Sequence, residues 1–261
     1  MTERHVNYDK IAPSYDQRYA VHTYGGIQTA LLALVQKTSS KHILEVGCGT
    51  GHWLAQLQPV ARGVCGLDLS LAMLQQAHQR KEDIPVICGD ASALPFADAI
   101  FDLIFCVNAF HHFAHPRRFI AEAQRVLRAG GALAIIGMDP HLGRDQWFIY
   151  DYFEGTHEAD LSRFPSGGTI LEWMITASFN RVEWQVAERI VQPQTSRNML
   201  NHPILQKSGT SQLALLTDEA YAKGMALIEA KLGQAEEEGE NLVFPVDISL
   251  TIITGYIDAN E

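Results

Sequence analysis

The chain has 261 residues, 47% of them hydrophobic and 19% charged, which suits one large globular domain or one domain with an insertion. Thirty acidic residues against twenty basic ones give a formal charge of −10, which opposes binding to nucleic-acid phosphates and to anionic membranes. The polar start MTERHVNYDK lacks the apolar core of a signal peptide, and no run approaches the roughly eighteen apolar residues of a membrane span. We therefore expect a cytoplasmic protein without nucleic-acid or stable membrane partners, as a monomer or homodimer.

The N-terminal 40 residues precede the first clear pattern, which begins at residue 42. From there short apolar runs alternate with amphipathic segments, and the runs are HILEV, GVCGL, PVICG, FDLIFCV and ALAIIGM. Runs of this length predict buried strands, and the segments between them have helical spacing. This βαβ series predicts an α/β fold with a doubly wound, mostly parallel, seven-stranded sheet covered by helices on both faces.

Local signals at helix ends agree with this pattern. Ser70 is expected to cap a helix that starts near Leu71, and Pro116 suits the first turn of another. Gly130-Gly131 is expected to end that second helix before the next strand.

After residue 139 the alternation is interrupted by an aromatic-rich segment. A helix near 169–178, a strand near 181–190 and a last strand near 243–257 resume it, while 193–240 is polar and largely helical. We expect a partly helical cap built from insertions at about 139–168 and 193–240, within a domain that covers 41–261.

The four cysteines lack the close spacing of zinc sites and redox dithiols. Cys48, Cys65, Cys88 and Cys106 are 17, 23 and 18 positions apart. Buried free thiols are the favoured interpretation, and no metal is expected.

Ligands of doubly wound sheets bind beyond the carboxyl ends of the strands, so the residues that follow the apolar runs carry most information. In ILEVGCGTG, the glycines at 47, 49 and 51 allow the backbone to come close to a ligand. Asp68 ends the second run, where a carboxylate can accept hydrogen bonds from both hydroxyls of a ribose. After the third run, the Asp90 side chain can accept from an adenine amino group while the Ala91 N–H donates to the ring. Together these residues predict an adenosine pocket.

Two kinds of adenosine ligand compete for this pocket. A dinucleotide fingerprint requires a third glycine where this chain has His52. Glu45, beside the loop, would repel a pyrophosphate but could hold an ammonium or sulfonium ligand. These features disfavour a nicotinamide-dependent oxidoreductase, which stays open as an alternative.

The combination resembles the class I S-adenosylmethionine-dependent methyltransferases. ILEVGCGTG resembles their first motif, LDLS their ribose-binding turn and GDASALPF their adenine-binding turn. FDLIFCVNAFHHF followed by AEAQRVLRAGG is similar to the subgroup of ubiquinone, menaquinone and small-molecule methyltransferases. The resemblance implies S-adenosylmethionine as cofactor, S-adenosylhomocysteine as product and the following cofactor-binding residues: Tyr15, Glu45, Gly47, Gly49, Asp68, Leu69, Met73, Asp90, Ala91, Asn108 and Ala109.

The segment YDKIAPSYDQRY is similar to the N-terminal helix with which that subgroup covers its cofactor. By this resemblance residues 1–40 form a helical cover, and Tyr8 and Tyr15 close over the methionine end. The alternative is that both tyrosines only pack the helix down.

The stretch NAFHHFAHP contains three histidines after the fourth strand. A metal would also need convergent carboxylates or thiols, so the stretch is interpreted as an active-site loop. His115 is expected at a helix start, facing solvent. The resemblance implies that one of His111 and His112 lies near cofactor and acceptor, and His112 is the preferred catalytic candidate.

The expected function is methyl transfer to a small molecule by in-line displacement, with a general base needed only for a protonated acceptor. The acceptor should lie under 139–168, where aromatic residues suit a flat or apolar molecule and Arg144 or Arg163 could pair with a carboxylate. The candidate substrate residues are Trp147, Tyr152 and Arg163, and the alternative is that Trp147, Phe148 and Tyr152 are ordinary core residues of a helical cap. A non-catalytic cofactor-binding protein is a further alternative.

Overall fold

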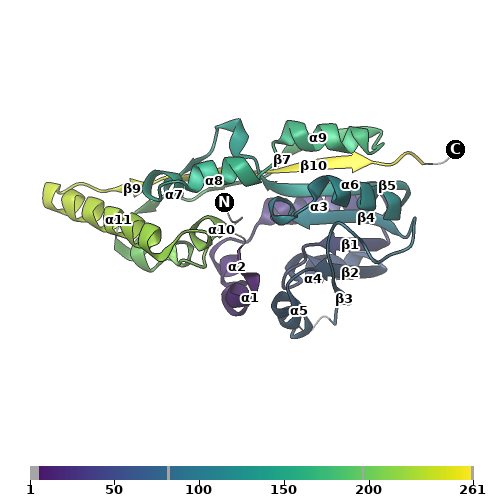
Figure 1. The fold of residues 1–261 in the computed structure, drawn as a ribbon, viewed down its shortest axis with the longest axis horizontal. Helices are drawn as coiled ribbons and strands as arrows, with labels where there is room; N and C mark the ends of the chain where they lie inside the picture. The colour runs from purple at the N-terminus through teal and green to yellow at the C-terminus, as the bar shows by residue number, and fades with distance from the viewer. Residues whose placement is uncertain (1–5, 81–82, 196, 260–261) are drawn as a thin grey trace.

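The computed structural model of the chain describes residues 6–80, 83–195 and 197–259. Over these residues, seven main strands form one sheet in the order β3-β2-β1-β4-β5-β10-β7 (Figure 1). The first five are mutually parallel, whereas β10 runs antiparallel to both of its neighbours. A two-residue strand, β6 (Gln146–Trp147), also pairs with β10. The predicted fold class is confirmed. The main strands are β1 (His42–Val46), β2 (Gly63–Asp68), β3 (Val86–Cys88), β4 (Phe101–Val107), β5 (Leu127–Met138), β7 (Arg181–Val191) and β10 (Val246–Tyr256).

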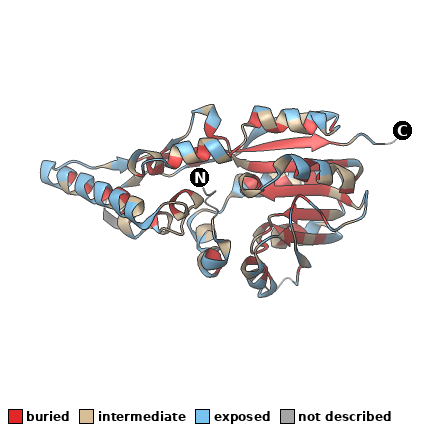
Figure 2. Cartoon of the chain, in the orientation of Figure 1, coloured by how far each residue is buried: buried red, intermediate tan, exposed pale blue. Residues whose placement is uncertain are grey.

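Helices cover both faces of the sheet because successive strand residues point to opposite sides. Ile43 and Leu103 pack with α3 (Gly25–Lys37), α4 (His52–Leu57) and α5 (Leu71–His78). Their neighbours Leu44 and Ile104 pack instead with α6 (Pro116–Val126) and α9 (Gly167–Thr176). Both faces are therefore apolar, and the central strands β1, β4, β5 and β10 are largely buried (Figure 2).

The two insertions form one elongated lobe at the end of the sheet (Figure 1). α8 contacts α10 and α7 contacts α11, and the Phe153 ring fills the space beside Gly224 on α11. Residues 71 positions apart thus share one small core. The lobe contains α7 (Phe148–Tyr152), α8 (Thr156–Arg163), β8 (Gln194–Thr195), η5 (Arg197–Asn201), η6 (Pro203–Leu205), α10 (Ser211–Ala214), α11 (Asp218–Glu238) and β9 (Val243–Phe244).

The N-terminal segment divides into two parts with different contacts. α1 (Tyr8–Ile11) and the turn η1 (Ala12–Ser14) pack on α5, and α2 (Gln17–Val21) contacts η6 in the lobe. In contrast, α3 packs against β7 and belongs to the helical layer of the sheet. Only residues 8–21 of the expected cover lie over the strand ends, and residues 1–5 of that prediction fall outside the described part.

Two expected helix ends are confirmed and one is wrong. The Ser70 side chain accepts a hydrogen bond from the Met73 N–H, and Pro116 begins α6. That helix ends at Val126 and not at Gly130-Gly131, because Leu127 is already the first residue of β5 and pairs with Phe101 of β4. Gly130 instead adopts a positive φ of 80° within the strand.

The cysteines are free, as expected, but they are not all buried. Cys48 and Cys106 are buried, Cys65 is half-buried and Cys88 is exposed in the short strand β3. Burial raises the pKa of the Cys65 thiol to about 11. In the described ranges no helix is both long enough and apolar enough to cross a membrane.

Candidate active site

The loop after β1 is held in place by the end of β2. The N–H groups of Gly47 and Cys48 both donate to the Leu67 carbonyl, at 2.7 and 3.1 Å. Gly47 has a φ of +73°, and a Cβ there would lie 2.4 Å from the Cβ of Ala109. The loop therefore requires glycine at this position, both for its backbone conformation and for its contact with the end of β4.

Asp68 organises the same edge of the sheet. Its Oδ2 accepts from the Gly49 N–H at 2.7 Å, and its Oδ1 accepts from the Ser70 N–H at 2.9 Å. Burial raises the pKa of Asp68, although these backbone N–H groups act in the opposite direction. Each carboxylate oxygen retains acceptor capacity, so the arrangement fits the two hydroxyls of a ribose.

The surface next to Asp68 fits an adenine ring. Leu69 is 74% exposed although it is apolar. Asp68 pairs with Cys88, so Gly89 and Asp90 follow at the same sheet edge. The Ser92 N–H donates to Asp90 at 2.7 Å and lowers the pKa of that carboxyl, which keeps it an acceptor. An exposed leucine beside an acceptor carboxylate matches the apolar face and the amino group of adenine.

Two residues expected to touch the cofactor, Glu45 and Met73, have almost fully buried side chains. Glu45 is 1% exposed in β1, its Oε2 has no hydrogen-bond partner, and burial raises its pKa well above the usual value. It therefore does not present a charge above the loop. Met73 is 2% exposed and packs against Ile11 and Ala12, so it supports the cover.

The cover brings Tyr8 and Tyr15 to the carboxyl ends of β1 and β4. Tyr15 lies beside the glycine loop, with its Cε1 3.8 Å from the position of a Cβ on Gly49. Tyr8 shares a 2.6 Å hydrogen bond between its hydroxyl and Nε2 of His112. Burial, with a smaller contribution from Tyr15, raises the pKa of Tyr8, so its phenol stays protonated.

The loop after β4 places two of its three histidines at the site. His111 stacks on Phe164 with ring centroids 3.8 Å apart, and burial lowers its pKa well below the usual value. It is therefore a neutral ring, and its Nε2 is buried without a partner. His112 faces Tyr8, whereas His115 is exposed before α6, as expected. Asn108 adopts a positive φ of 51° where its N–H donates to the Ile136 carbonyl at 2.8 Å.

A large cavity opens between the cover, the strand ends and the lobe. It encloses about 1370 Å³ of empty space, which includes its open mouth. The cover contributes Tyr8, Tyr15 and Arg18, and the apolar wall is formed by residues from the strands and the lobe. That wall contains Met138, Trp147, Phe164, Ile190, Val246, Ile248 and Leu250.

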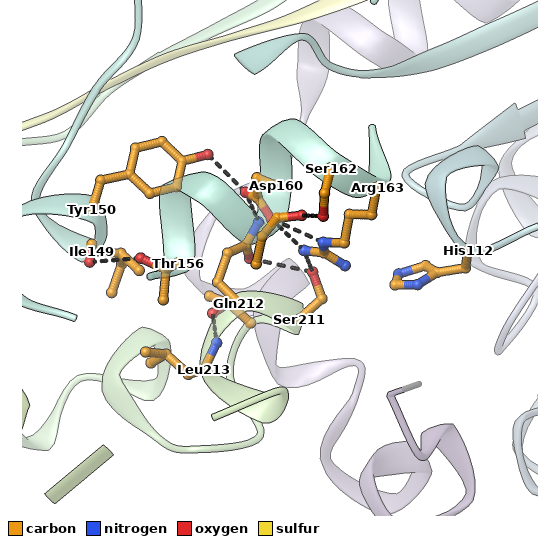
Figure 3. Close-up of polar contacts among 12 residues, drawn as sticks. His112, Ile149, Tyr150, Thr156, Asp160, Ser162, Arg163, Ser211, Gln212 and Leu213 are labelled. Atoms are coloured by element: carbon orange, nitrogen blue, oxygen red, sulfur yellow. Dashed lines mark hydrogen bonds and ion pairs between the residues drawn. The ribbon is translucent and has the colours of Figure 1, made fainter. Parts of the chain in front are cut away.

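The expected acceptor residues are only partly brought to this cavity. Trp147 lines it, but Tyr152 does not and packs its ring on Phe244. Arg163 lies behind the lining and donates from Nε and Nη2 to Asp160, at 2.9 and 2.7 Å (Figure 3). Arg144 is exposed on the surface. The predictions for Tyr152, Arg163 and Arg144 as direct substrate contacts are therefore not supported.

Arg18 is not among the residues predicted for the site, and no single residue was predicted from the segment around 202–212, although the second insertion was expected to be part of the cap. Both line the cavity, although they belong to the cover and to the second insertion. Arg18 lies one helical turn after Tyr15 in the quoted motif, and that spacing was an available signal. In the described ranges, no group of three or more His, Cys, Asp or Glu side chains is arranged to hold a metal ion.

Comparison with known proteins identifies the family. A methyltransferase domain model matches residues 44–135, which run from β1 into β5. A demethylmenaquinone methyltransferase from Thermotoga maritima is 31% identical over 160 residues, which cover 58% of this chain and 70% of that protein. One from Renibacterium salmoninarum is 33% identical over 131 residues, covering 49% of this chain and 55% of the relative.

Structural similarity extends over more of the chain. A protein from Anabaena variabilis, assigned as a methyltransferase of an antibiotic biosynthesis pathway, matches with a TM-score of 0.69 at 24% identity. The match covers 88% of this chain and 96% of that one, and it shows a shared fold. The chain belongs to the class I S-adenosylmethionine-dependent methyltransferases. Within that family its sequence is similar to the menaquinone-biosynthesis subgroup.

Proposed function

We propose that the protein transfers the methyl group of S-adenosylmethionine to a small molecule bound in the cavity. The observation that carries this proposal is that Tyr15 of the cover both lines the cavity and lies beside the glycine loop, with its Cε1 3.8 Å from the position of a Cβ on Gly49. The matched relatives are methyltransferases, and none of them favours the nicotinamide alternative.

The residues around the loop support a specific placement of the cofactor. Asp68 is proposed to bind the ribose hydroxyls, Leu69, Asp90 and Ala91 the adenine, and Gly47 and Gly49 the methionine part. Tyr15, Asn108 and Ala109 then border its methyl-bearing end. The bound sulfonium supplies an activated methyl group, and the chain needs to orient the acceptor and exclude water.

Proton transfer is assigned to the His112–Tyr8 pair. Both side chains line the cavity, and their hydrogen bond fixes the orientation of the imidazole. If the acceptor arrives protonated, Nε2 of His112 takes its proton after the Tyr8 hydroxyl rotates away. His111 has the lesser role of holding the loop against Phe164.

Cofactor binding tests the proposal directly. Calorimetry should show that S-adenosylhomocysteine binds the wild type and that Asp68→Asn weakens binding by roughly tenfold to a hundredfold, because a charged hydrogen-bond acceptor is lost. Asp98→Asn is the matched control, since the Asp98 side chain is 76% exposed and pairs with Arg125 on the surface. Thermal unfolding without ligand separates binding from loop damage. A wild type that binds reduced nicotinamide but not S-adenosylhomocysteine would contradict the proposal.

Turnover tests catalysis and separates the two histidines. A screen of small acceptors with radiolabelled cofactor should find a substrate, and His112→Ala should then lower kcat by roughly a hundredfold, the lower range for a general base. His111→Phe, which keeps an aromatic ring on Phe164, should change kcat by less than His112→Ala. Equal and small effects from both variants would refute the assignment, and binding without any turnover would favour the non-catalytic alternative.

The roles of the cover and of the two insertions, the oligomeric state and the cellular location are also proposals. We infer that residues 8–21 cover the cofactor and that the two insertions enclose the acceptor. A cytoplasmic monomer or homodimer is compatible with the acidic surface and with the absence of a membrane-spanning helix among the described residues.

A further inference from the structure

The lining of the cavity contains positive charge and no negative charge. No described lining residue is an aspartate or a glutamate, although the chain has thirty of them. Arg18 is a lining residue that is charged at every physiological pH. We propose that Arg18 binds an anionic group of the acceptor, so that the substrates are amphipathic organic acids. This inference rests on the proposed methyltransferase function.

Arg18 is held in place without being neutralised. Its guanidinium lies over the Tyr15 ring, 3.8 Å from the ring centroid, and its Nε is buried without a hydrogen-bond partner. Among the described residues no carboxylate lies within ion-pair distance of it. A stacked guanidinium keeps its edge donors in one plane, ready for a planar anion. Leaving such a partly buried cation without a partner is costly, which favours an anionic ligand.

Two acidic side chains that contact residues of the cavity lining, Glu188 and Asp160, are already engaged in hydrogen bonds. Glu188 accepts hydrogen bonds from the N–H groups of Gly26 and Ile27 and from Nε2 of His22, the last at 3.3 Å. These contacts engage both of its carboxylate oxygens near the start of α3. Asp160, within the lobe, already accepts hydrogen bonds from Tyr150, Arg163 and Gln212. Neither carboxylate can turn to Arg18 without breaking several hydrogen bonds.

The rest of the lining indicates the chemistry of the uncharged part of the substrate. Trp147, Phe164 and Ile190 provide an apolar wall, while Gln192, Gln194 and His202 line other parts of the same cavity. Arg18 belongs to α2, which contacts η6, and so comes from a different element than these apolar residues. An aromatic or branched aliphatic molecule with a carboxylate satisfies both regions. A negative acceptor would also be attracted to the sulfonium that this family uses.

A competing assignment gives Arg18 to the carboxylate of the cofactor itself. Tyr15 touches both Arg18 and the side of the loop at Gly49, so the cofactor's methionine part would lie nearby. However, acidic residues are absent from the whole described lining, a larger surface than the carboxylate of the cofactor alone would contact. Separate measurements of cofactor binding and acceptor binding distinguish the two assignments.

The experiment uses the full chain saturated with S-adenosylhomocysteine and a panel of two-ring aryl carboxylates, each paired with its primary amide. Calorimetry should show the acids binding the wild type at least about tenfold more tightly than the amides, as a charge-assisted hydrogen bond predicts. Arg18→Gln should abolish this preference and leave amide and S-adenosylhomocysteine affinity unchanged. Arg189→Gln, at an exposed arginine paired with Asp247, is the control and should retain the preference.

Three results would overturn the inference. The first is a wild type that binds no acid of the panel or does not distinguish acids from amides, and the second is an unchanged preference in Arg18→Gln. The third is weaker binding of S-adenosylhomocysteine by Arg18→Gln with unchanged binding of its decarboxylated analogue, which would assign Arg18 to the cofactor. Failure of the wild type to bind S-adenosylhomocysteine at all would instead refute the proposed function.

Discussion

Gly47→Ala should lower both stability and cofactor affinity far more than an ordinary glycine replacement. Gly47 has a φ of +73°, a conformation that costs an L-residue about 1–2 kcal/mol. The new Cβ would also lie 2.4 Å from that of Ala109, and overpacking of this kind costs about 1–3 kcal/mol. The Gly47 N–H is tied to the Leu67 carbonyl, so the loop cannot move away freely. We expect a loss of about 2–5 kcal/mol in the free energy of unfolding, the sum of these two costs.

Gly239→Ala is the matched control for this prediction. Gly239 also has a positive φ, of 67°, at the end of α11, but nothing lies within 4 Å of a Cβ placed there. It should lose only the conformational part, about 1–2 kcal/mol, and none of the cofactor affinity. Urea unfolding gives the two free energies, and calorimetry with S-adenosylhomocysteine should show at least a tenfold loss for Gly47→Ala alone, equivalent to about 1.4 kcal/mol. Equal unfolding free energies for the two variants would show that the Ala109 contact is unimportant.

The cofactor half of the site could be predicted because its signals are local. The glycine loop, Asp68 and the Ser70 cap lie within 24 consecutive positions, and each follows directly from a strand end. Strand ends are readable from apolar runs, and parallel strands carry the residues that follow them to one edge. The same reasoning placed Asp90 and the His111–His112 loop at that edge.

The sequence could not show which side of a strand or helix a residue would occupy. Glu45 and Met73 belong to the right motifs, yet both point into the protein. Glu45 is the second-last residue of β1, where neighbouring residues alternate between two buried faces, so its polar side chain gave no sign of its direction.

The residues of the acceptor cavity could not be predicted from the sequence for a different reason. Its wall combines Tyr8, Trp147, Ile190 and Ser211, which are separated by up to about 200 positions. Aromatic residues in 139–168 were a sound indication of a core, but packing against Phe244 turned Tyr152 away from the cavity. Contacts of such long range depend on how the two insertions pair, which periodicity does not reveal.

A buried polar network joins the two insertions and supports the cavity from behind. Asp160 on α8 is fully buried and accepts hydrogen bonds from the Tyr150 hydroxyl at 2.7 Å and from Nε2 of Gln212 at 2.6 Å. Arg163 pairs with the same carboxylate and also donates to Ser211 Oγ at 2.6 Å (Figure 3). Because Ser211 and Gln212 line the cavity, Asp160 fixes part of its wall without touching a ligand.

Asp160→Ala should therefore destabilise the lobe strongly, by about 3–5 kcal/mol, because it leaves the Arg163 cation buried without its counter-charge. Asp151→Ala, at an exposed aspartate on α7, should change stability by less than about 0.5 kcal/mol. Denaturant unfolding measures both, and hydrogen exchange should show faster exchange in 203–214 for Asp160→Ala than for Asp151→Ala. The double variant Asp160→Leu with Arg163→Met should recover part of the loss, since it removes the unpaired charge. Tyr150 and Gln212 still lack their hydrogen-bond acceptor in that variant. Full recovery of the free energy of unfolding would therefore mean that these neutral hydrogen bonds do not contribute to stability. No recovery would mean that the unpaired Arg163 charge does not cause the loss.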